Sequence, residues 1–415
     1  MPETRRAVQR AFLLHAGPPD SEGLDELQEL LKTAGAATVG SATQTRDEPH
    51  PDTYLGKGKL EEIAEILETS NANLVVADDE LTPRQERSLE KLLGKPVLDR
   101  TAVILDIFAL HAGSAEGKLQ VELAQLEYNL VRMRGLWTHL ERLGGGIGTR
   151  GPGESQLETD RRLARDRISQ VKRRLKKVQS NRSLMRTERA RSAVPSVALV
   201  GYTNAGKSSL MNSVTDAELG TRDELFHTLD PITRQFDHHG KSYVMTDTVG
   251  FIRKLPHQLV DAFGATLEET LEADVLVVVE DASEPDTEAN ERRLAVEATL
   301  EQIGATAMPR IRVLNKVDLL TEEERFNLAM SDPTALLVSA RTGEGVSAML
   351  DAVAASIGTR LLEVKLEIPY SEGSVLAELH RIAGDLKRED TATGVSVVAK
   401  LRPDVAARWS RFAVD

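Results

Sequence analysis

The nine residues Gly201–Ser209, GYTNAGKSS, constrain this chain more than any other stretch. They fit the pattern G-x-x-x-x-G-K-[ST] and follow an apolar run, Val197–Val200, that is typical of a buried strand. A helix-compatible run, Ser208–Val214, comes next. A loop between a strand and a helix can cradle phosphate with its backbone N–H groups, aided by the helix N-terminus. We therefore expect Lys207 to reach the β- and γ-phosphates of a nucleotide and Ser208 to ligate Mg²⁺.

The length and composition limit the kinds of protein that this chain can be. The chain has 415 residues, enough for about three domains, with 40% hydrophobic and 28% charged residues. It has no cysteine, which excludes disulfides, thiolate metal sites and a thiol nucleophile. No apolar run approaches the ~18 residues of a membrane span, and Met1–Arg10 lacks the core of a signal peptide. We expect a cytoplasmic protein.

The net charge of −13 is unevenly distributed. The stretch Gln156–Ser192 has 13 Lys/Arg against 4 Asp/Glu, a net charge of +9, so the remainder of the chain carries −22. A basic stretch on an acidic protein favours a local contact with nucleic acid. The alternative is a solvated helix face without a partner.

The first part of the chain, residues 8–113, alternates between apolar runs and amphipathic stretches, which predicts a small βαβ-type domain. The expected strands are Ala11–His15, Ala36–Gly40, Asn73–Asp78 and Pro96–Leu98, all suited to buried parallel positions. The expected helices are Gly23–Lys32, Lys59–Glu68, Pro83–Leu93 and Arg100–Ala112. The loop Tyr54–Lys59 at a helix entry either meets an anion or is a plain glycine-rich cap.

Two heptad seams follow, and together they predict two antiparallel helices packed on each other. The first seam consists of Leu119, Leu123, Leu126, Leu130, Met133, Trp137 and Leu140. The second consists of Ala164, Ile168, Val171, Leu175 and Val178. Between them, Gly144–Gly153 cannot continue a helix and predicts a glycine-rich tip.

The remaining sequence predicts a doubly wound, mostly parallel sheet and a compact β-α-β appendage. Sheet strands are expected at Val197–Val200, Ile232–Asp237, Ser242–Asp247, Val275–Asp281, Ile311–Asn315 and Ala335–Ser339. The appendage comprises Leu361–Pro369, Ser374–Gly384 and Val395–Leu401. The expected domains are 1–113 (α/β), 114–193 (helical hairpin), 194–360 (nucleotide-binding) and 361–415 (small α+β).

Four motifs follow predicted strands or loops in the order that a GTPase requires. Thr228 in the loop Thr221–Pro231 is placed to close on Mg²⁺ and the γ-phosphate. Asp247–Gly250 supplies a carboxylate for the water shell of Mg²⁺ and an N–H for the γ-phosphate. Asn315–Asp318 supplies a carboxylate that accepts the N1–H and the amine of guanine, a pair that adenine lacks. Ser339-Ala340 supplies an N–H for guanine O6.

The predicted site residues divide by role. Lys207, Thr228 and Gly250 are expected to act on the γ-phosphate, and Ser208 and Thr228 to ligate Mg²⁺. The nucleotide is expected to contact Gly201, Tyr202, Thr203, Asn204, Ala205, Gly206, Lys207, Ser208, Ser209, Phe226, Thr228, Asp247, Thr248, Val249, Gly250, Asn315, Lys316, Asp318, Ser339 and Ala340.

The position after Gly250 bears on hydrolysis. Many GTPases place a Gln there to orient the attacking water, but here the residue is Phe251, whose ring cannot do so. We expect slow intrinsic hydrolysis, with help from a partner and from K⁺ held near Asn204. The alternative is that Asn204 only braces the loop.

GYTNAGKSS, DTVGF and NKVD resemble a translation-factor-class GTPase, and GGGIGTRGPGE with QLETDRR is similar specifically to the HflX family. YLGKGKLEEI, DRTAVILDIFALHA and KLQVELAQLEY also match that family, over roughly residues 8–360. The resemblance implies a P-loop GTPase fold with bound Mg²⁺ and GTP or GDP. It implies binding to the large ribosomal subunit and its rRNA, and splitting of stalled or idle ribosomes under stress.

The resemblance also implies weak ATP binding at the N-terminal domain, although no residue there specifies an adenine pocket. We expect a monomer. Two alternatives to ribosome splitting stay open on the residues alone. One is a GTPase that assists ribosome assembly, and the other is an RNA-binding or remodelling protein regulated by nucleotide.

Overall fold

The computed structural model describes residues 9–17, 22–133, 152–192, 194–215, 225–226, 228–254, 270–358, 362–382, 386–401 and 403–414. By internal contacts the chain forms two compact units. Unit 1 comprises Met1–Val178, Arg222–Asp230 and Ile252–Ala265, and unit 2 comprises Gln179–Thr221, Pro231–Phe251 and Thr266–Asp415. The four-domain division stays a prediction.

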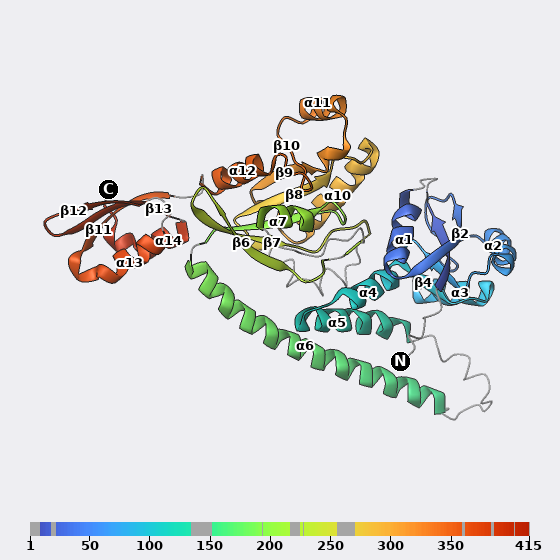
Figure 1. Cartoon of the computed structure of the whole chain (residues 1–415). Helices are drawn as coiled ribbons and strands as arrows, with labels where there is room; N and C mark the ends of the chain where they lie inside the picture. The colour runs from blue at the N-terminus through green and yellow to red at the C-terminus, as the bar shows by residue number, and fades with distance from the viewer. Residues whose placement is uncertain are drawn as a thin grey trace, which may run out of the picture. The chain divides into compact units, whose positions relative to one another are not determined.

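Unit 1 begins with a four-stranded parallel sheet in the order β2-β1-β3-β4 (Figure 1). Its strands are β1 (Gln9–Ala16), β2 (Ala36–Gln44), β3 (Leu74–Ala77) and β4 (Val97–Asp99). Its helices are α1 (Glu22–Thr33), α2 (Lys57–Thr69), α3 (Pro83–Leu93) and α4 (Arg100–His111). The alternating strands and helices expected for this part of the chain are confirmed.

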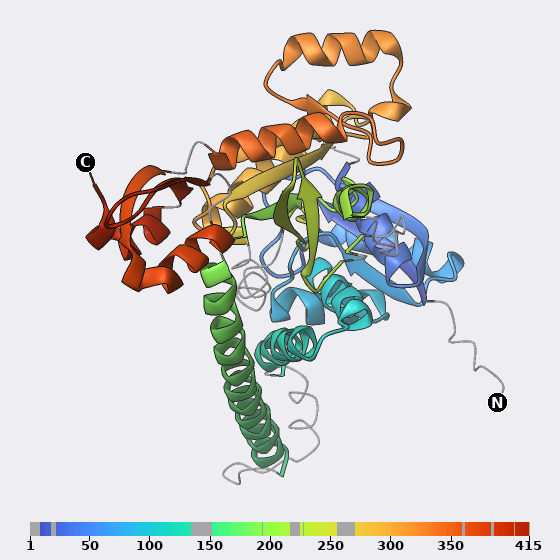
Figure 2. The ribbon, with the colours of Figure 1, turned by 60° about the vertical axis from the view of Figure 1, so that its left-hand side comes forward.

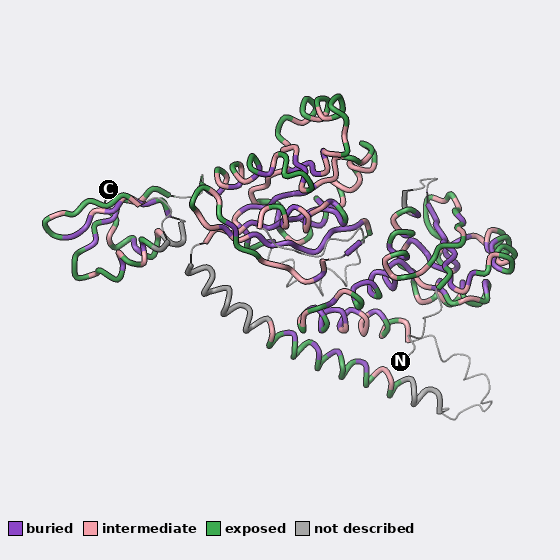
Figure 3. The backbone as a smooth tube through the Cα atoms, viewed as in Figure 1, coloured by how far each residue is buried: buried purple, intermediate pink, exposed green. Residues whose placement is uncertain are grey.

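Local signals explain where these elements begin. Thr82 and Gln85 form a capping box at the start of α3, and Asp99 caps α4 by accepting the N–H of Ala102. Strands β1 and β3 are almost wholly buried, as Figure 3 shows. The expectation that β2 is buried was wrong, because β2 is an edge strand and mostly exposed.

The two heptad seams pack on each other in unit 1, where α5 (Ala115–Arg132) lies beside α6 (Pro152–Ser192) in both views (Figures 1 and 2). The shared core consists of Leu119, Leu123, Ile168, Val171 and Leu175, with Leu126, Leu130 and Val178 packed against it. The ion pair Lys172–Glu127 flanks this seam. Trp137, Leu140 and residues 144–151 of the glycine-rich tip lie outside the described residues.

Unit 2 contains a six-stranded sheet in the order β10-β9-β8-β5-β7-β6. Its strands are β5 (Ser196–Gly201), β6 (Ile232–His238), β7 (Lys241–Asp247), β8 (Val275–Asp281), β9 (Arg310–Asn315) and β10 (Leu336–Leu337). Its helices are α7 (Lys207–Thr215), α10 (Asp286–Gln302), η2 (Val317–Leu319), α11 (Glu322–Ser331) and α12 (Val346–Gly358). Only β6 runs antiparallel to its neighbour, so the prediction of a mostly parallel sheet is confirmed.

Both faces of the central strands are buried, as a sheet with helices on both sides requires. Side chains of α7 and α12 join alternate residues of β5 and β8 in one core, which includes Leu210, Met349, Val197 and Val277. This core also contains Phe236 of β6. The face of the sheet that α7 and α12 cover is therefore the face toward which Phe236 points.

The last part of unit 2 is a three-stranded antiparallel sheet in the order β11-β13-β12. Its elements are β11 (Leu362–Pro369), η3 (Tyr370–Glu372), α13 (Gly373–Ile382), β12 (Leu386–Asp390), β13 (Gly394–Leu401), α14 (Pro403–Arg408) and η4 (Ser410–Phe412). The sequence prediction missed β12, because LKRED is highly charged and resembles a loop. Among all described residues, no helix combines the length and apolarity that a bilayer span requires.

Candidate nucleotide-binding site

The loop between β5 and α7 has the backbone of a phosphate cradle. Gly206 has a φ of +93°, and a Cβ there would lie 2.2 Å from the Asn315 Nδ2 atom. A Cβ on Gly250 would lie 2.8 Å from the Thr203 Cα and 3.0 Å from the Lys207 Nζ. Only glycine fits these two positions without displacing the loop. The loop thus keeps its backbone N–H groups open to an anion at the start of α7.

Lys207, the first residue of α7, is buried against the loop. Its Nζ donates to the carbonyls of Gly201 at 3.1 Å and Tyr202 at 2.8 Å. Burial lowers the pKa of the Lys207 ammonium to about 8, and the charge of Asp247 offsets part of that effect. An ammonium group that is shielded from water in this way attracts a phosphate more strongly than an ammonium group in water does.

The hydroxyl of Ser208 donates to the Asp247 Oδ2 atom at 2.6 Å. A hydroxyl and a carboxylate oxygen are the hard ligands that Mg²⁺ prefers, so this pair fits the metal that accompanies a nucleoside triphosphate. When bound, Mg²⁺ would neutralise charge on the β- and γ-phosphates. Thr248, whose hydroxyl donates to the Leu199 carbonyl at 2.7 Å, fixes the turn that follows Asp247.

The base-reading loop at the end of β9 is joined to the phosphate loop. The carboxamide of Asn315 donates to the Ala205 carbonyl at 2.9 Å and accepts the N–H of Ala340 at 3.0 Å. The hydroxyl of Ser339 donates to the Asp318 Oδ1 atom at 2.6 Å, which orients the carboxylate expected to read guanine. Hydrogen bonds thus connect Asn315 with Ala205 and Ala340, and Ser339 with Asp318.

Phe251 takes part in the site through its backbone. Its N–H donates to the Gly201 carbonyl at 3.1 Å, and its carbonyl accepts the N–H of Thr203 at 2.8 Å. The ring is 1% exposed and belongs to the interior. Phe251 therefore links the end of the D-x-x-G turn to the phosphate loop, and its ring offers no group that can position water.

The predicted site residues fall into both units. Unit 2 holds the residues of the phosphate loop, the D-x-x-G turn and the base-reading loops, namely Gly201–Ser209, Asp247–Gly250, Asn315, Lys316, Asp318, Ser339 and Ala340. Unit 1 holds Phe226 and Thr228. The roles of these residues toward a nucleotide stay predictions. Residues 221–224 and His227 lie outside the described part of the chain.

The segment that carries Thr228 is anchored within unit 1. Phe226 is 2% exposed, and its ring meets that of Phe108 edge-on at 4.6 Å between centroids. The Asp230 carboxylate accepts the N–H groups of Gly113 at 3.0 Å and Ser114 at 2.6 Å, and the Ser114 hydroxyl as well. A carboxylate at the N-terminus of α5 is favoured by the helix dipole. The Phe226 ring is therefore packed in the interior of unit 1, and its expected contact with the nucleotide stays a prediction.

The segment after Phe251 is anchored in unit 1 by an ionic cluster that sequence reasoning missed. Lys254 lies 3.0 Å from the Asp78 carboxylate and 2.5 Å from that of Asp79. The Arg100 guanidinium donates to Asp78 at 2.9 Å and to the carbonyl of Arg253 at 3.2 Å. Burial would raise the pKa of Asp78, but His15, Arg100 and Lys254 together hold it below its usual value.

A signal for this cluster was present in the sequence. Asp78 and Asp79 follow β3, and Arg100 follows β4. Polar residues that end neighbouring parallel strands meet at one edge of a sheet. The helix-entry loop before α2 contains Tyr54, which is buried and donates its hydroxyl to Asp79 at 2.6 Å. Gly56 caps α2 without a side-chain bond, and anion or ATP binding in this part of the chain stays a prediction.

The phosphate loop, the Ser208–Asp247 pair and the base-reading carboxylate all follow strands of one doubly wound sheet in unit 2. An ATPase has no use for Asp318, because adenine lacks the N1–H and the amine that this carboxylate would accept. The class of protein that this fold and site define is a P-loop GTPase.

Comparisons with known proteins agree with this class. Three family models match in succession, described as "GTP-binding GTPase N-terminal" over residues 21–109, "GTP-binding GTPase Middle Region" over residues 111–189, and "50S ribosome-binding GTPase" over residues 196–316. "GTPase HflX" of Caldanaerobacter subterraneus subsp. tengcongensis is 43% identical over 418 residues, which cover 100% of this chain and 96% of the relative. "GTPase HflX" of Escherichia coli strain K12 is 43% identical over 401 residues, 94% of this chain and 93% of the relative.

Among solved structures, a GTP-binding protein of the archaeon Sulfolobus solfataricus in complex with GDP is 25% identical, with a TM-score of 0.44. The match covers 85% of this chain and 99% of that protein. On the strength of the two curated relatives and the three consecutive family models, this chain belongs to the HflX family of GTPases. It binds GTP and GDP and hydrolyses GTP.

Proposed function

We propose that this GTPase binds the large ribosomal subunit in its GTP state, splits stalled or idle ribosomes under stress, and leaves after hydrolysis. The observation that carries the proposal is the exposed basic face of α6. Arg173, Arg174, Lys176 and Lys177 are all exposed beside the buried seam residue Leu175. Side chains that face away from a helix seam are accessible to the phosphates of rRNA.

The description of the matched GTPase model, a 50S ribosome-binding GTPase, supports the same partner. The acidic remainder of the chain limits where RNA can approach, because its charge of −22 repels phosphate. The basic helix and the glycine-rich stretch Gly144–Gly153 therefore form the contact with rRNA in this proposal. The protein acts as a monomer in the cytoplasm.

Nucleotide state is transmitted through the anchored segments of unit 1. Asp230 holds one end of the loop that carries Thr228, and Lys254 holds the segment that follows the D-x-x-G turn. The γ-phosphate and its Mg²⁺ order such loops in GTPases, and hydrolysis releases them. Here that ordering acts on α5 and on the end of β3, because those elements supply the anchors.

Because Phe251 stands where many GTPases have a water-positioning Gln, other groups must assist hydrolysis. We propose two such groups, namely the ribosome and a K⁺ ion near Asn204. Asn204 lies in the phosphate loop with a φ of +62° and is exposed. A monovalent cation there would stabilise charge that develops between the β- and γ-phosphates.

A density gradient of intact ribosomes with the protein and GTP, GDP or a non-hydrolysable analogue tests the function. Splitting predicts free subunits with GTP and with the analogue, and protein retained on the large subunit only with the analogue. A profile of intact ribosomes in all three cases contradicts splitting. Retention on incomplete large subunits alone would identify an assembly GTPase, and binding to naked rRNA that ignores nucleotide would identify an RNA-remodelling protein.

A further inference from the structure

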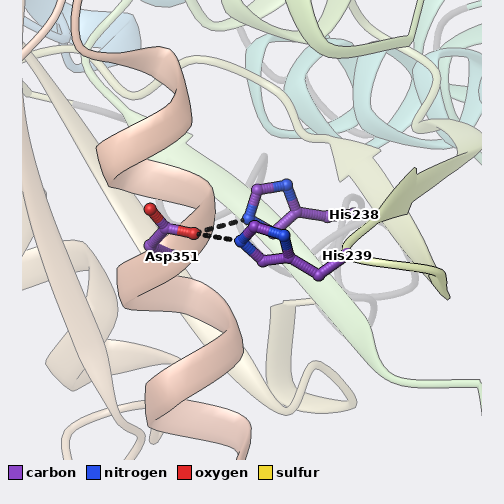
Figure 4. A group of neighbouring side chains, drawn as sticks. All are labelled: His238, His239 and Asp351. Atoms are coloured by element: carbon purple, nitrogen blue, oxygen red, sulfur yellow. Dashed lines mark hydrogen bonds and ion pairs between the residues drawn. The ribbon is translucent and has the colours of Figure 1, made fainter.

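Two histidines and one aspartate converge at the tip of the β6–β7 hairpin in unit 2, away from the residues assigned to the nucleotide (Figure 4). The Nε2 atoms of His238 and His239 lie 2.7 Å and 2.8 Å from the same oxygen, Oδ1 of Asp351. All three ligand atoms lie within 4.8 Å of one another. The His238 side chain is 11% exposed, whereas those of His239 and Asp351 are 73% and 55% exposed.

His238 and His239 are adjacent in the sequence, so both can face Asp351 only if the backbone departs from the alternating geometry of a strand. His238 ends β6 and lies two residues after Phe236, so it points toward the face covered by α12, which carries Asp351. Alternation would send the next residue to the opposite face. Instead, His239 and Gly240 form a two-residue turn with φ values of +50° and +73°, the type I′ geometry.

A positive φ is uncommon for any residue other than glycine, and a two-residue turn does not need histidine there. The turn places the two imidazoles with ring centroids 4.1 Å apart, and both face one carboxylate. Both Nε2 atoms lie within hydrogen-bond distance of the same oxygen of Asp351. The cluster is therefore a preformed group of two nitrogen ligands and one oxygen ligand.

We propose that His238, His239 and Asp351 bind one borderline divalent transition-metal cation, of which Zn²⁺ is the leading example. Ligand atoms around tetrahedral zinc lie about 2.0–2.2 Å from the metal and hence roughly 3.3 Å from each other. The observed spacing between each Nε2 and Oδ1 needs an increase of only about half an ångström to reach that value. Three protein ligands leave the fourth position for water or for a ligand from a partner.

The ion in this site differs in chemistry from the ion at the nucleotide. Mg²⁺ demands oxygen ligands in octahedral geometry, which two imidazoles do not supply, whereas imidazole suits zinc, cobalt and nickel. The Mg²⁺ that accompanies GTP is therefore not expected to occupy this cluster, which stays available to a transition-metal cation. A bound cation would fasten the β6–β7 hairpin to α12 across the face of the sheet, which stabilises the GTPase unit as a ligand stabilises any folded state.

The test uses untagged full-length protein, stripped with chelator and then saturated with GDP and Mg²⁺. Calorimetric titration with Zn²⁺, and visible absorption on titration with Co²⁺, are expected to show one equivalent with an intense tetrahedral or five-coordinate Co²⁺ spectrum. His239→Asn and Asp351→Asn are each expected to weaken binding about ten-fold or more. His380→Asn, which alters an exposed histidine of α13, is the matched control and should bind as the parent does.

GDP affinity, measured for every variant, shows that the GTPase unit is folded, since none of the altered residues belongs to the nucleotide site. Zn²⁺ should also raise the melting temperature of the parent and of His380→Asn, but not that of Asp351→Asn. Binding that is absent from the folded parent overturns the proposal. So does binding that persists undiminished in both His239→Asn and Asp351→Asn.

Discussion

The side-chain amide of Asn315 donates a hydrogen bond to the carbonyl of Ala205 at 2.9 Å, which joins the base-reading loop to the phosphate loop. The same carboxamide accepts the N–H of Ala340 at 3.0 Å, and Asn315 is 2% exposed. Both ends of the amide are therefore used in holding loops together. The loops that we predict to recognise the base and the phosphates are therefore joined through one side chain.

Asn315→Ala should weaken GTP and GDP equally, by about 1–3 kcal/mol, because it leaves a buried carbonyl and a buried N–H without a partner. Equilibrium titration with both nucleotides measures this loss. An effect confined to GTP would show that Asn315 acts on the γ-phosphate instead. The melting temperature of the nucleotide-free variant should also fall, since the two loops lose their connection.

Asp318→Asn should weaken GTP binding and improve binding of xanthosine triphosphate. The change replaces one carboxylate acceptor by a donor, which suits the extra carbonyl of xanthine and misplaces a hydrogen bond to guanine, at a cost of about 1–3 kcal/mol. Direct titration of both nucleotides measures the switch. Unchanged GTP affinity would refute guanine recognition by Asp318. Ser339→Ala removes only the 2.6 Å hydrogen bond that orients the carboxylate. It should weaken GTP binding by a smaller amount and should not improve binding of xanthosine triphosphate.

Lys207→Met should stabilise the nucleotide-free protein while abolishing tight GTP binding. Because burial lowers the pKa of Lys207 from 10.5 to about 8, the unfolded chain binds more protons than the folded one between those two pH values. The stability of the parent should rise with pH in that window, by up to about 3 kcal/mol. Scanning calorimetry from pH 7 to pH 10 measures the difference between parent and variant, which should shrink as pH rises. Lys241→Met, which removes a lysine from β7 of the same sheet, is the control for loss of a positive charge.

Free protein should hydrolyse GTP slowly, and faster in K⁺ than in Na⁺. The ring of Phe251 is buried and cannot orient water, so charge stabilisation must come from elsewhere. Steady-state hydrolysis with and without large subunits, for the parent and for Asn204→Ala, tests both substitutes. Fast hydrolysis by the free protein in Na⁺ would remove the need for either one. A response to K⁺ that survives Asn204→Ala would show that Asn204 does not hold the ion and would assign Asn204 to bracing the loop.

Reversal of charge at Arg173, Arg174, Lys176 and Lys177 should weaken binding to the large subunit and flatten its dependence on salt. Each lost phosphate contact lowers the slope of log affinity against log salt by about 0.7 to 0.9. Binding measured from low to physiological salt gives that slope, and GTP affinity should be unchanged. Reversal at Glu363, Lys365 and Glu367, exposed on β11, is the control for altered surface charge. If the α6 variant binds the large subunit as tightly as the parent does, the basic face of α6 is a solvated surface without an RNA partner.

Much of the fold could be predicted because local signals were strong. The runs Val197–Val200 and Val275–Asp281 are apolar and β-branched, and the observed strands differ from them by at most a residue or two. The charged strand β12 could not be predicted from its own residues, because its pairing with β13 determines its structure. The same holds for β2, whose exposure follows from its place at the edge of a sheet.

The site divides in a similar way. The phosphate and base motifs consist of contiguous residues, so their contacts, such as Ser208 with Asp247, follow once the strands are placed. In the ionic cluster, Asp78 and Lys254 are 176 positions apart in the sequence. The positions of Asp78 and Arg100 after neighbouring strands were a signal for one half of the cluster, but no pattern indicated Lys254. Phe226 stands in a motif-bearing loop, yet its ring packs on Phe108, because a large apolar side chain is most stable when buried.

One of the points at which the chain passes from unit 2 to unit 1 is the peptide bond between Phe251 and Ile252. Phe251 is tied to the phosphate loop on one side of that bond, and Arg253 and Lys254 are tied to Arg100 and Asp78 on the other. The backbone that leaves the D-x-x-G turn is therefore held by hydrogen bonds at Phe251 and again at Arg253, two residues later. The length of free chain between these two anchors is a single residue, Ile252.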